Sequence, residues 1–177
     1  MAALFSIRTK RLLLDSLTVD DWPVVQSEWG VPAVARMTAT VKYPWSEADV
    51  KDWIAARLDQ GIDGFGCAIR LHDGTLIGSV GAGGDPINLG YMLGEKHWGK
   101  GYASETCHAF LQKAFAHFQS LTEIEASVFD DNPASANVLL KLGFTRVSET
   151  DCSSLARVEA SPSSLYRLHA GQLKANP

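Results

Sequence analysis

The chain has 177 residues, of which 46% are hydrophobic and 20% are charged, a balance typical of a globular domain with its own apolar core. Sixteen basic residues against twenty acidic ones give a formal net charge of −4, which argues against sequence-independent binding to nucleic acid. We therefore expect one domain over residues 1–177, with its core at about 8–169, and no nucleic-acid partner.

The cysteines are three in number and lie far apart, at Cys67, Cys107 and Cys152. An odd number without a C-x-x-C pair predicts neither a disulfide framework nor a zinc site, and favours a reducing, cytoplasmic compartment. The five histidines also lack metal-ligand spacing, so no metal is expected. No signal peptide is expected at the N-terminus, and no stretch approaches the roughly 20 apolar residues of a membrane span.

The first half of the chain predicts a strand, two helices and a hairpin. The strand is expected at residues 8–16 and the helices begin after Thr18 and after Ser46, with residues 30–44 irregular between them. The second helix presents one apolar face, made of Val50, Trp53, Ile54 and Leu58. Residues 65–71 and 75–80 read as strands around a tight turn at 72–74, followed by a glycine-rich loop at 81–85.

The second half alternates strands and helices. A strand at residues 89–93 leads into a glycine loop at 98–101 and a long helix to about residue 118. After a strand at 122–129, Asn132 and Pro133 open the last helix and Gly143 closes it. Strands follow at 145–149 and 164–168, with a loop at 153–163 and a loose tail from 170. This order predicts an α/β fold with helices packed on a mixed sheet.

The most informative stretch is residues 89–105, LGYMLGEKHWGKGYASE, a strand, a glycine loop and a helix start. Glycines let consecutive backbone N–H groups turn inward, and the positive end of the helix adds to them, so the unit suits a phosphate or pyrophosphate. A Walker A loop fails because Gly101 replaces the required hydroxyl, and the dinucleotide pattern G-x-G-x-x-G fails as well. The pattern [RQ]-x-x-G-x-[GA] fits at Gly101 and Ala103, with Trp98 in place of Arg or Gln.

The chain resembles the GNAT N-acetyltransferases, and in particular their RimJ/RimL-like branch. Four segments carry the resemblance in order and spacing: TKRLLL at 9–14, LGYML at 89–93, WGKGYASE at 98–105, and NPASAN at 132–137 ending in KLGF at 141–144. The resemblance implies a mostly antiparallel mixed sheet that splays open after the strand at 89–93. It also implies a soluble enzyme that uses acetyl-coenzyme A and an amine acceptor, a peptide N-terminus or a small molecule.

The resemblance places the cofactor as well. The pantetheine arm is expected in the split beside Tyr91, Met92 and Leu93, with the backbone near Met92 binding the oxyanion. The pyrophosphate is expected on residues 98–104, and Asn132 and Ser135 reach the arm from the other side. The full set of expected cofactor residues is Tyr91, Met92, Leu93, Trp98, Gly99, Lys100, Gly101, Tyr102, Ala103, Ser104, Asn132 and Ser135.

Several candidate residues also have a purely structural interpretation. Gly99 and Gly101 would suit an ordinary turn, Asn132 is a good helix cap, and Lys100 would suit a solvated surface. Tyr43 and Trp45 are either packing residues or the wall of the acceptor pocket, and we take them as candidate acceptor contacts. Cys107 is expected to be a small core residue.

The catalytic machinery departs from the family pattern. Asn88 stands where many relatives have a glutamate base, and Leu139 and Leu140 occupy the region of the usual tyrosine acid. Ser135 is the candidate acid, and Asp85 and Asp130 are candidate bases by their positions near strand ends. Two alternatives stay open: a GNAT-like module that binds acyl-CoA without turnover, and a P-loop phosphotransferase.

Overall fold

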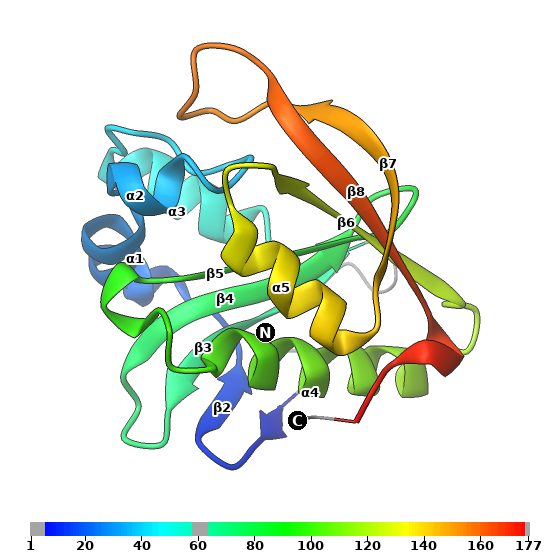
Figure 1. Cartoon of the computed structure of the whole chain (residues 1–177). Coiled ribbons are helices and arrows are strands. Elements are labelled where there is room, and N and C mark those ends of the chain that lie inside the picture. The colour runs from blue at the N-terminus through cyan, green and yellow to red at the C-terminus, as the bar shows by residue number, and fades with distance from the viewer. Residues whose placement is uncertain (1–5, 58–63, 176–177) are drawn as a thin grey trace.

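The computed structural model describes residues 6–57 and 64–175. The strands in these residues form one eight-stranded sheet with the order β1-β2-β3-β4-β5-β6-β8-β7 (Figure 1). Neighbouring strands are antiparallel except for β5 and β6, which run parallel. The predicted fold class, a mixed and mostly antiparallel sheet flanked by helices, is confirmed.

The predicted strand at residues 8–16 is wrong in one respect, because it is two strands. β1 (Ile7–Arg8) and β2 (Leu12–Asp15) pair antiparallel and are joined by a tight turn. The turn is held by Thr9, whose N–H donates to the Leu12 carbonyl and whose hydroxyl oxygen accepts from the Leu12 N–H at 2.9 Å. The three turn residues include no glycine or proline, so the sequence carried no turn signal there.

The predicted hairpin is confirmed, but its second strand is longer than expected. β3 (Gly64–Leu71) and β4 (Leu76–Gly83) pair along their length, so residues 81–83 belong to a strand and not to a loop. Gly66 lies opposite Gly81, and a Cβ on Gly66 would come within 3.0 Å of the Val80 carbonyl oxygen. The glycines therefore allow the two backbones to approach closely, which composition alone cannot distinguish from a loop.

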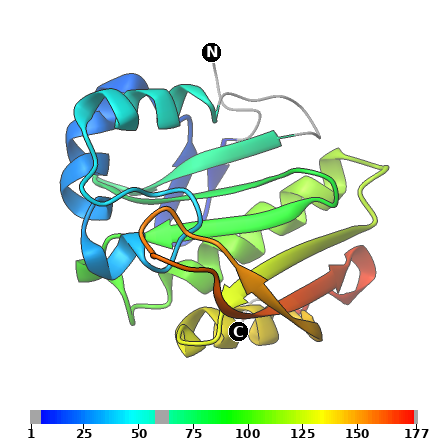
Figure 2. The ribbon, with the colours of Figure 1, turned by 90° about the horizontal axis from the view of Figure 1, so that it is seen from above.

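The helices cover both faces of the sheet (Figure 2). The N-terminal group comprises η1 (Val19–Asp21), α1 (Trp22–Trp29), α2 (Pro32–Ala35) and α3 (Glu47–Ala55). The opposite face carries α4 (Tyr102–His117) and α5 (Pro133–Leu142). α2 interrupts the region expected to be irregular. The expected cap of α3 is confirmed, since the Ser46 hydroxyl accepts from the Asp49 N–H at 3.1 Å.

Two apolar cores follow from this arrangement. Successive residues of a strand point to opposite faces, so Ile69 enters the core under α4 and α5 while Ala68 enters the core under α1 to α3. Cys107 is fully buried in the first core, as predicted. On α3, Val50, Trp53 and Ile54 are buried in the second core as predicted, and Leu58 lies outside the described residues.

The sheet opens between β5 (Asn88–Leu93) and β6 (Glu123–Phe129). These parallel strands share a single register pair, Asn88 with Glu125, whereas β6 pairs with β8 (Ser161–His169) along its whole length. From that pair the two strands diverge toward their C-terminal ends. Residues 90–93 therefore have a strand partner on one side only, as the sequence resemblance led us to expect.

The C-terminal region is more ordered than predicted. Gly143 ends α5 with a left-handed φ of 103°, as expected, but β7 (Thr145–Cys152) and β8 are both longer than predicted, and the loop between them shrinks to residues 153–160. The predicted loose tail instead forms η4 (Ala170–Gln172), and the Lys174 N–H donates to the Leu142 carbonyl. Among the described residues, no helix has both the length and the apolar character to cross a bilayer.

Candidate active site

The glycine loop lies where the split opens, just beyond the end of β5. Gly99 and Gly101 adopt left-handed φ angles of 71° and 77°, and the chain between β5 and the loop forms η3 (Glu95–His97). None of the backbone N–H groups of residues 99–104 donates a hydrogen bond within the described part of the chain. A Cβ added to Gly99 would meet nothing within 4 Å. The structure thus presents a run of free donors at the positive end of α4, with open space beside Gly99.

Trp98 secures the loop to the end of β5. Its indole Nε1–H donates to the Leu93 carbonyl at 2.8 Å, and the ring remains 44% exposed. This hydrogen bond ties the start of the glycine loop to β5 without a charged side chain. Lys100 is exposed, while Tyr102, Ala103 and Ser104 are half-buried in the first turn of α4.

Arg11 reaches the same loop from the N-terminal hairpin, and the sequence reasoning missed it. Its Nη1 donates to the Lys100 carbonyl at 2.8 Å, and its guanidinium lies 4.7 Å from the centre of the Tyr102 ring. A Cβ on Gly101 would lie 3.4 Å from Arg11 Nη2. The motif segments TKRLLL and WGKGYASE are therefore in contact, although nothing in either segment indicated a pairing.

Glu105 joins these two segments. Its carboxylate accepts from the Thr9 hydroxyl at 2.6 Å, from the Arg11 N–H at 2.9 Å and from Arg11 Nε at 2.6 Å. Burial opposes the charge of this side chain, but the donors from Thr9 and Arg11 outweigh burial and lower the pKa of Glu105. A charged Glu105 in the first turn of α4 thus holds Arg11 against the glycine loop.

His97 lies behind the loop as a neutral, buried imidazole. Burial first, then the nearby cations Lys100 and Lys96, lower the pKa of His97. Its Nε2 is buried without a hydrogen-bond partner in the described residues. At neutral pH this histidine therefore adds no charge to the loop.

Across the split, the start of α5 faces β5. The side-chain oxygen Oδ1 of Asn132 accepts a hydrogen bond from the Ser135 N–H at 3.2 Å, which confirms Asn132 as the helix cap. The Ser135 hydroxyl lies 2.7 Å from the hydroxyl of Tyr91 on β5. Tyr91 and Leu93 point toward the α4 side of the sheet, and Met92 packs on the other side, under the N-terminal helices. The structure therefore brings Tyr91, Asn132 and Ser135 together.

The two candidate acceptor residues have different environments. Tyr43 is 55% exposed, whereas Trp45 is only 5% exposed and stacks edge-on against Trp53 at a centroid distance of 5.4 Å. Trp45 thus supports the packing of the N-terminal helices in this structure. Contact of either residue with an acceptor stays a prediction.

The β7–β8 loop is fastened over the N-terminal helices near the end of β6. The Ser154 hydroxyl donates to the Thr38 carbonyl at 2.6 Å, and the Leu155 N–H donates to the Ala39 carbonyl. Arg157 and Arg36 both bind the carboxylate of Asp131 at 2.7 Å. Hydrogen bonding to Arg157 is the main cause that lowers the pKa of Asp131. These contacts join three segments around the open end of the split.

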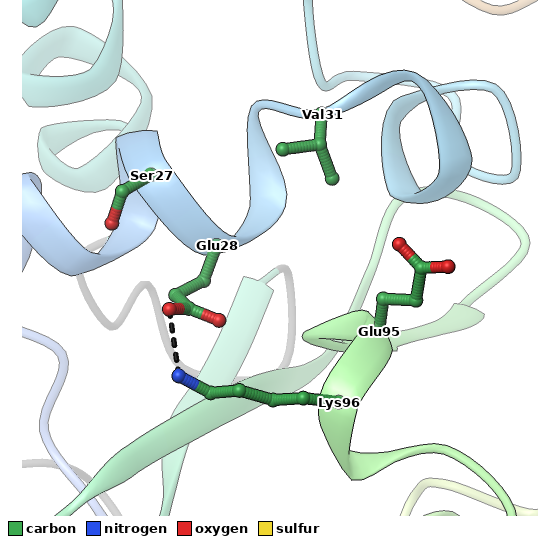
Figure 3. Close-up of a pocket in the computed structure, with 5 residues that line it drawn as sticks. All are labelled: Ser27, Glu28, Val31, Glu95 and Lys96. Atoms are coloured by element: carbon green, nitrogen blue, oxygen red, sulfur yellow. Dashed lines mark hydrogen bonds and ion pairs between the residues drawn. The ribbon is translucent and has the colours of Figure 1, made fainter.

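A cavity of about 360 Å³ lies between α1 and η3, lined by Ser27, Glu28, Val31, Glu95 and Lys96 (Figure 3). Lys96 extends to Glu28 in an ion pair of 2.7 Å, while Glu95 points away from that pair. Two carboxylates and one ammonium suit a cation better than a phosphate. A second cavity, also about 360 Å³, lies between β1 and α4. Neither is lined by residues of β5 or β6.

The candidate bases lie at opposite ends of the split. Asn88 and the nearby Asp85 are at its closed end, where Asn88 is paired with Glu125. Asp130 lies at the open end and accepts from the Ser164 hydroxyl at 2.8 Å. Among the described residues, there is no group of three or more His, Cys, Asp or Glu side chains that could hold a metal ion.

An open sheet with free amides at a glycine loop, next to a helix start, defines a class of sites that suit a phosphate-bearing ligand with an extended arm along a split strand pair. Comparison with known proteins agrees: the acetyltransferase (GNAT) domain profile matches residues 11–145. The chain therefore belongs to the GNAT acetyltransferase family and is an acyltransferase.

One relative and two solved structures of the same fold show how far the similarity extends. An uncharacterized N-acetyltransferase, p20 of Bacillus licheniformis, is 30% identical over 151 residues, covering 80% of this chain and 83% of p20. A putative ribosomal-protein-serine acetyltransferase of Vibrio cholerae shares the fold with a TM-score of 0.76 at 21% identity, covering 96% of this chain and 99% of that one. A spermidine N-acetyltransferase of Vibrio cholerae, solved with CoA and spermine, has a TM-score of 0.77 at 14% identity over 93% and 98% of the two chains.

Proposed function

We propose that this protein transfers the acetyl group of acetyl-coenzyme A to an amine, on a peptide or protein N-terminus or on a small molecule. The observation that carries the proposal is the run of free N–H groups at residues 99–104, placed at the open end of the β5–β6 split. A ligand with a pyrophosphate joined to a long, extended arm matches both features at once. The spermidine acetyltransferase with the same fold was solved with CoA, which supports this choice.

The expected binding mode uses each part of the site. The pyrophosphate lies on the N–H groups from Gly99 to Ser104, with Lys100 beside it and Trp98 and Tyr102 flanking the loop. The pantetheine arm runs in the split along the unpaired edge of Tyr91, Met92 and Leu93, as an added strand would. Asn132 and Ser135 approach the arm from α5. The open space over Gly99 is consistent with a phosphate at van der Waals distance from the backbone.

The chemistry is direct attack of the amine nitrogen on the thioester carbonyl. Fixing both partners in one geometry is itself a large effect, and a backbone N–H near Met92 would stabilise the oxyanion. The carbon–nitrogen bond forms, the carbon–sulfur bond breaks, and the leaving thiolate takes a proton, for which Ser135 is the candidate donor. Metal ions have no part in this scheme.

The acceptor is best sought among amines of low pKa. An α-amine with a pKa near 7.8 is neutral about one time in seven at pH 7, whereas a lysine amine near 10.4 is neutral only about once in 2,500. With Asn88 in place of a glutamate, the site offers no carboxylate at the usual base position to deprotonate a lysine. An α-amine also fits the RimJ/RimL-like branch, which the sequence segments and the Vibrio cholerae ribosomal-protein-serine acetyltransferase fold both favour.

The test is release of the CoA thiol from acetyl-CoA over a panel of peptide N-termini, amino acids, polyamines and aminoglycosides. We expect metal-independent turnover with at least one α-amine, and a pH–rate profile that follows the free amine. Acetyl-CoA at 100 times its Kd should stabilise the fold by about 2.7 kcal/mol, also in EDTA. Absence of any such stabilisation, together with a response to Mg²⁺ and ATP, would contradict the proposal.

The rival function is a binding module that holds acyl-CoA without turnover. The absent glutamate and tyrosine are the observations that favour it. It predicts the same thermal stabilisation by acetyl-CoA but no thiol release with any amine, so the panel separates the two. We further propose that the protein works in the cytoplasm, as its isolated free cysteines suggest.

A further inference from the structure

One hydrogen bond crosses the split on the side where the thioester is expected. The Tyr91 hydroxyl on β5 lies 2.7 Å from Ser135 Oγ on α5, and 3.3 Å from the Ser135 carbonyl oxygen. The two residues are 44 positions apart, and only the fold brings them together. This contact is a direct side-chain link between the two sides of the proposed cofactor channel, and it involves the candidate acid.

We propose that Tyr91 is a positioning residue for proton transfer: its hydroxyl donates to Ser135 Oγ and thereby aims the Ser135 proton at the leaving sulfur. The proposal rests on the acetyltransferase function proposed above and adds a residue to it. Tyr91 was expected to contribute only its backbone to the site, as one edge of the pantetheine channel. The structure gives its side chain a role as well.

The hydrogen-bonding capacity of a serine hydroxyl makes the argument specific. Ser135 Oγ has one proton and two lone pairs. If Tyr91 donates to one lone pair, the Ser135 proton is free for the sulfur and the second lone pair is free to accept. When the amine has attacked, its ammonium proton can pass to Ser135 Oγ while the Ser135 proton passes to the thiolate. The serine ends as it began, the amide and the CoA thiol are both neutral, and no separate base is consumed.

Either hydroxyl of this contact could donate, and the proposal assigns the donation to Tyr91. Burial, with a smaller contribution from the buried thiol of Cys107, raises the pKa of Tyr91 above its usual range. The phenol therefore keeps its proton at every physiological pH and is able to donate it. The shorter contact, to Oγ, is the better one for that proton.

The substitution that tests this is Tyr91→Phe, because it removes the hydroxyl and keeps the ring in the core. Tyr166→Phe is the matched control, since Tyr166 is a buried tyrosine of the same core on β8, where it lies opposite residues of β6 and β7. Ser135→Ala and the double variant Tyr91→Phe with Ser135→Ala complete a double-mutant cycle. Each protein is assayed with acetyl-CoA and the amine that the parent enzyme acetylates fastest. The thermal unfolding of each protein is also measured, to confirm that it folds.

We expect Tyr91→Phe to lower kcat about tenfold while KM for acetyl-CoA changes less than about threefold, because a positioned proton donor acts mainly in the transition state. Ser135→Ala should lower kcat about a hundredfold, and the double variant should be no slower than Ser135→Ala. Tyr166→Phe should keep the parental kcat.

Three results would overturn the inference. The first is a parental kcat in Tyr91→Phe, the second a loss seen only in KM for acetyl-CoA, and the third a double variant whose losses multiply. If the parent enzyme itself releases no thiol with any amine, the proposed function fails and this inference fails with it. If the parent enzyme is active and the Tyr91→Phe variant has the same kcat, only this inference is refuted and the proposed function stands.

Discussion

Arg11 and Glu105 lie 94 positions apart in the chain, yet Arg11 Nε is 2.6 Å from Glu105 Oε2. This ion pair connects the turn of the first hairpin to the first turn of α4. Arg11 also donates to the Lys100 carbonyl, so the pair acts as a brace on the outer side of the glycine loop. The brace holds the Lys100 carbonyl toward Arg11, while the N–H groups of residues 99–104 donate no hydrogen bond within the described part of the chain.

Removing the brace should weaken acetyl-CoA binding. Arg11→Ala loses a charged hydrogen bond to the loop, worth about 1.5–3 kcal/mol, so we expect KM for acetyl-CoA to rise roughly tenfold or more with little change in kcat. Lys10→Ala removes the same charge from an exposed neighbour and is the control. Equal effects of the two variants would show that charge near the loop matters and the brace does not.

Glu105 should make stability depend on pH in the acid range. Its pKa is lowered in the folded state, so its contribution is complete above the unfolded value of about 4.3 and is lost as the pH falls through the folded value. Glu105→Gln should therefore melt below the parent at pH 7, and the gap in Tm should narrow as the pH drops below about 4.

The control for this experiment is Glu149→Gln. Glu149 is 82% exposed and pairs with Arg146 on the surface, so its removal should leave Tm nearly unchanged at every pH. A gap between the parent and Glu105→Gln that stays constant down to pH 3 would contradict the assignment of the pH dependence to this carboxylate.

The glycine loop should lose its ligand when side chains are added. Gly99→Ala places a Cβ in the open space over the loop, at a left-handed φ that costs about 1–2 kcal/mol. Gly74→Ala, in the remote β3–β4 turn, carries the same kind of backbone strain at φ 91° with equally open surroundings. Both should reduce Tm similarly, but only Gly99→Ala should reduce the affinity for acetyl-CoA in titration calorimetry.

Gly101→Val extends this test, since its side chain also meets Arg11 Nη2. We expect a folded protein without measurable acetyl-CoA binding. Parental affinity in a folded Gly101→Val protein would place the cofactor elsewhere.

The two aromatic acceptor candidates should behave differently. Trp45 is buried, so Trp45→Ala should lower the free energy of unfolding by about 3–5 kcal/mol and cannot report cleanly on the acceptor. Tyr43→Ala, on an exposed side chain, should leave stability within about 0.5 kcal/mol and raise KM for the acceptor but not for acetyl-CoA. The exposed Val147 on β7 supplies a control, Val147→Ala. Unchanged acceptor kinetics in Tyr43→Ala would remove this residue from the acceptor pocket.

The sequence determined the features that are local in the chain. Caps such as Ser46, Asn132 and Gly143 were predictable because each acts on backbone groups within three or four residues. The strand, glycine loop and helix at residues 89–105 were predictable for the same reason, and the binding of a pyrophosphate there stays a prediction. Where local signals were ambiguous, as for the glycines at 81–83, the prediction was wrong, because only the neighbouring strand shows that a close approach is needed.

The tertiary structure decided the features that depend on distant partners. The brace between Arg11 and Glu105 and the contact between Tyr91 and Ser135 join segments 94 and 44 positions apart, and neither periodicity nor composition encodes such a pairing. The fold also decided that Trp45 is buried while Tyr43 is exposed, since both belong to one short loop with the same apolar character. A local pattern specifies which face a residue prefers, but the packing of separate elements specifies what that residue touches.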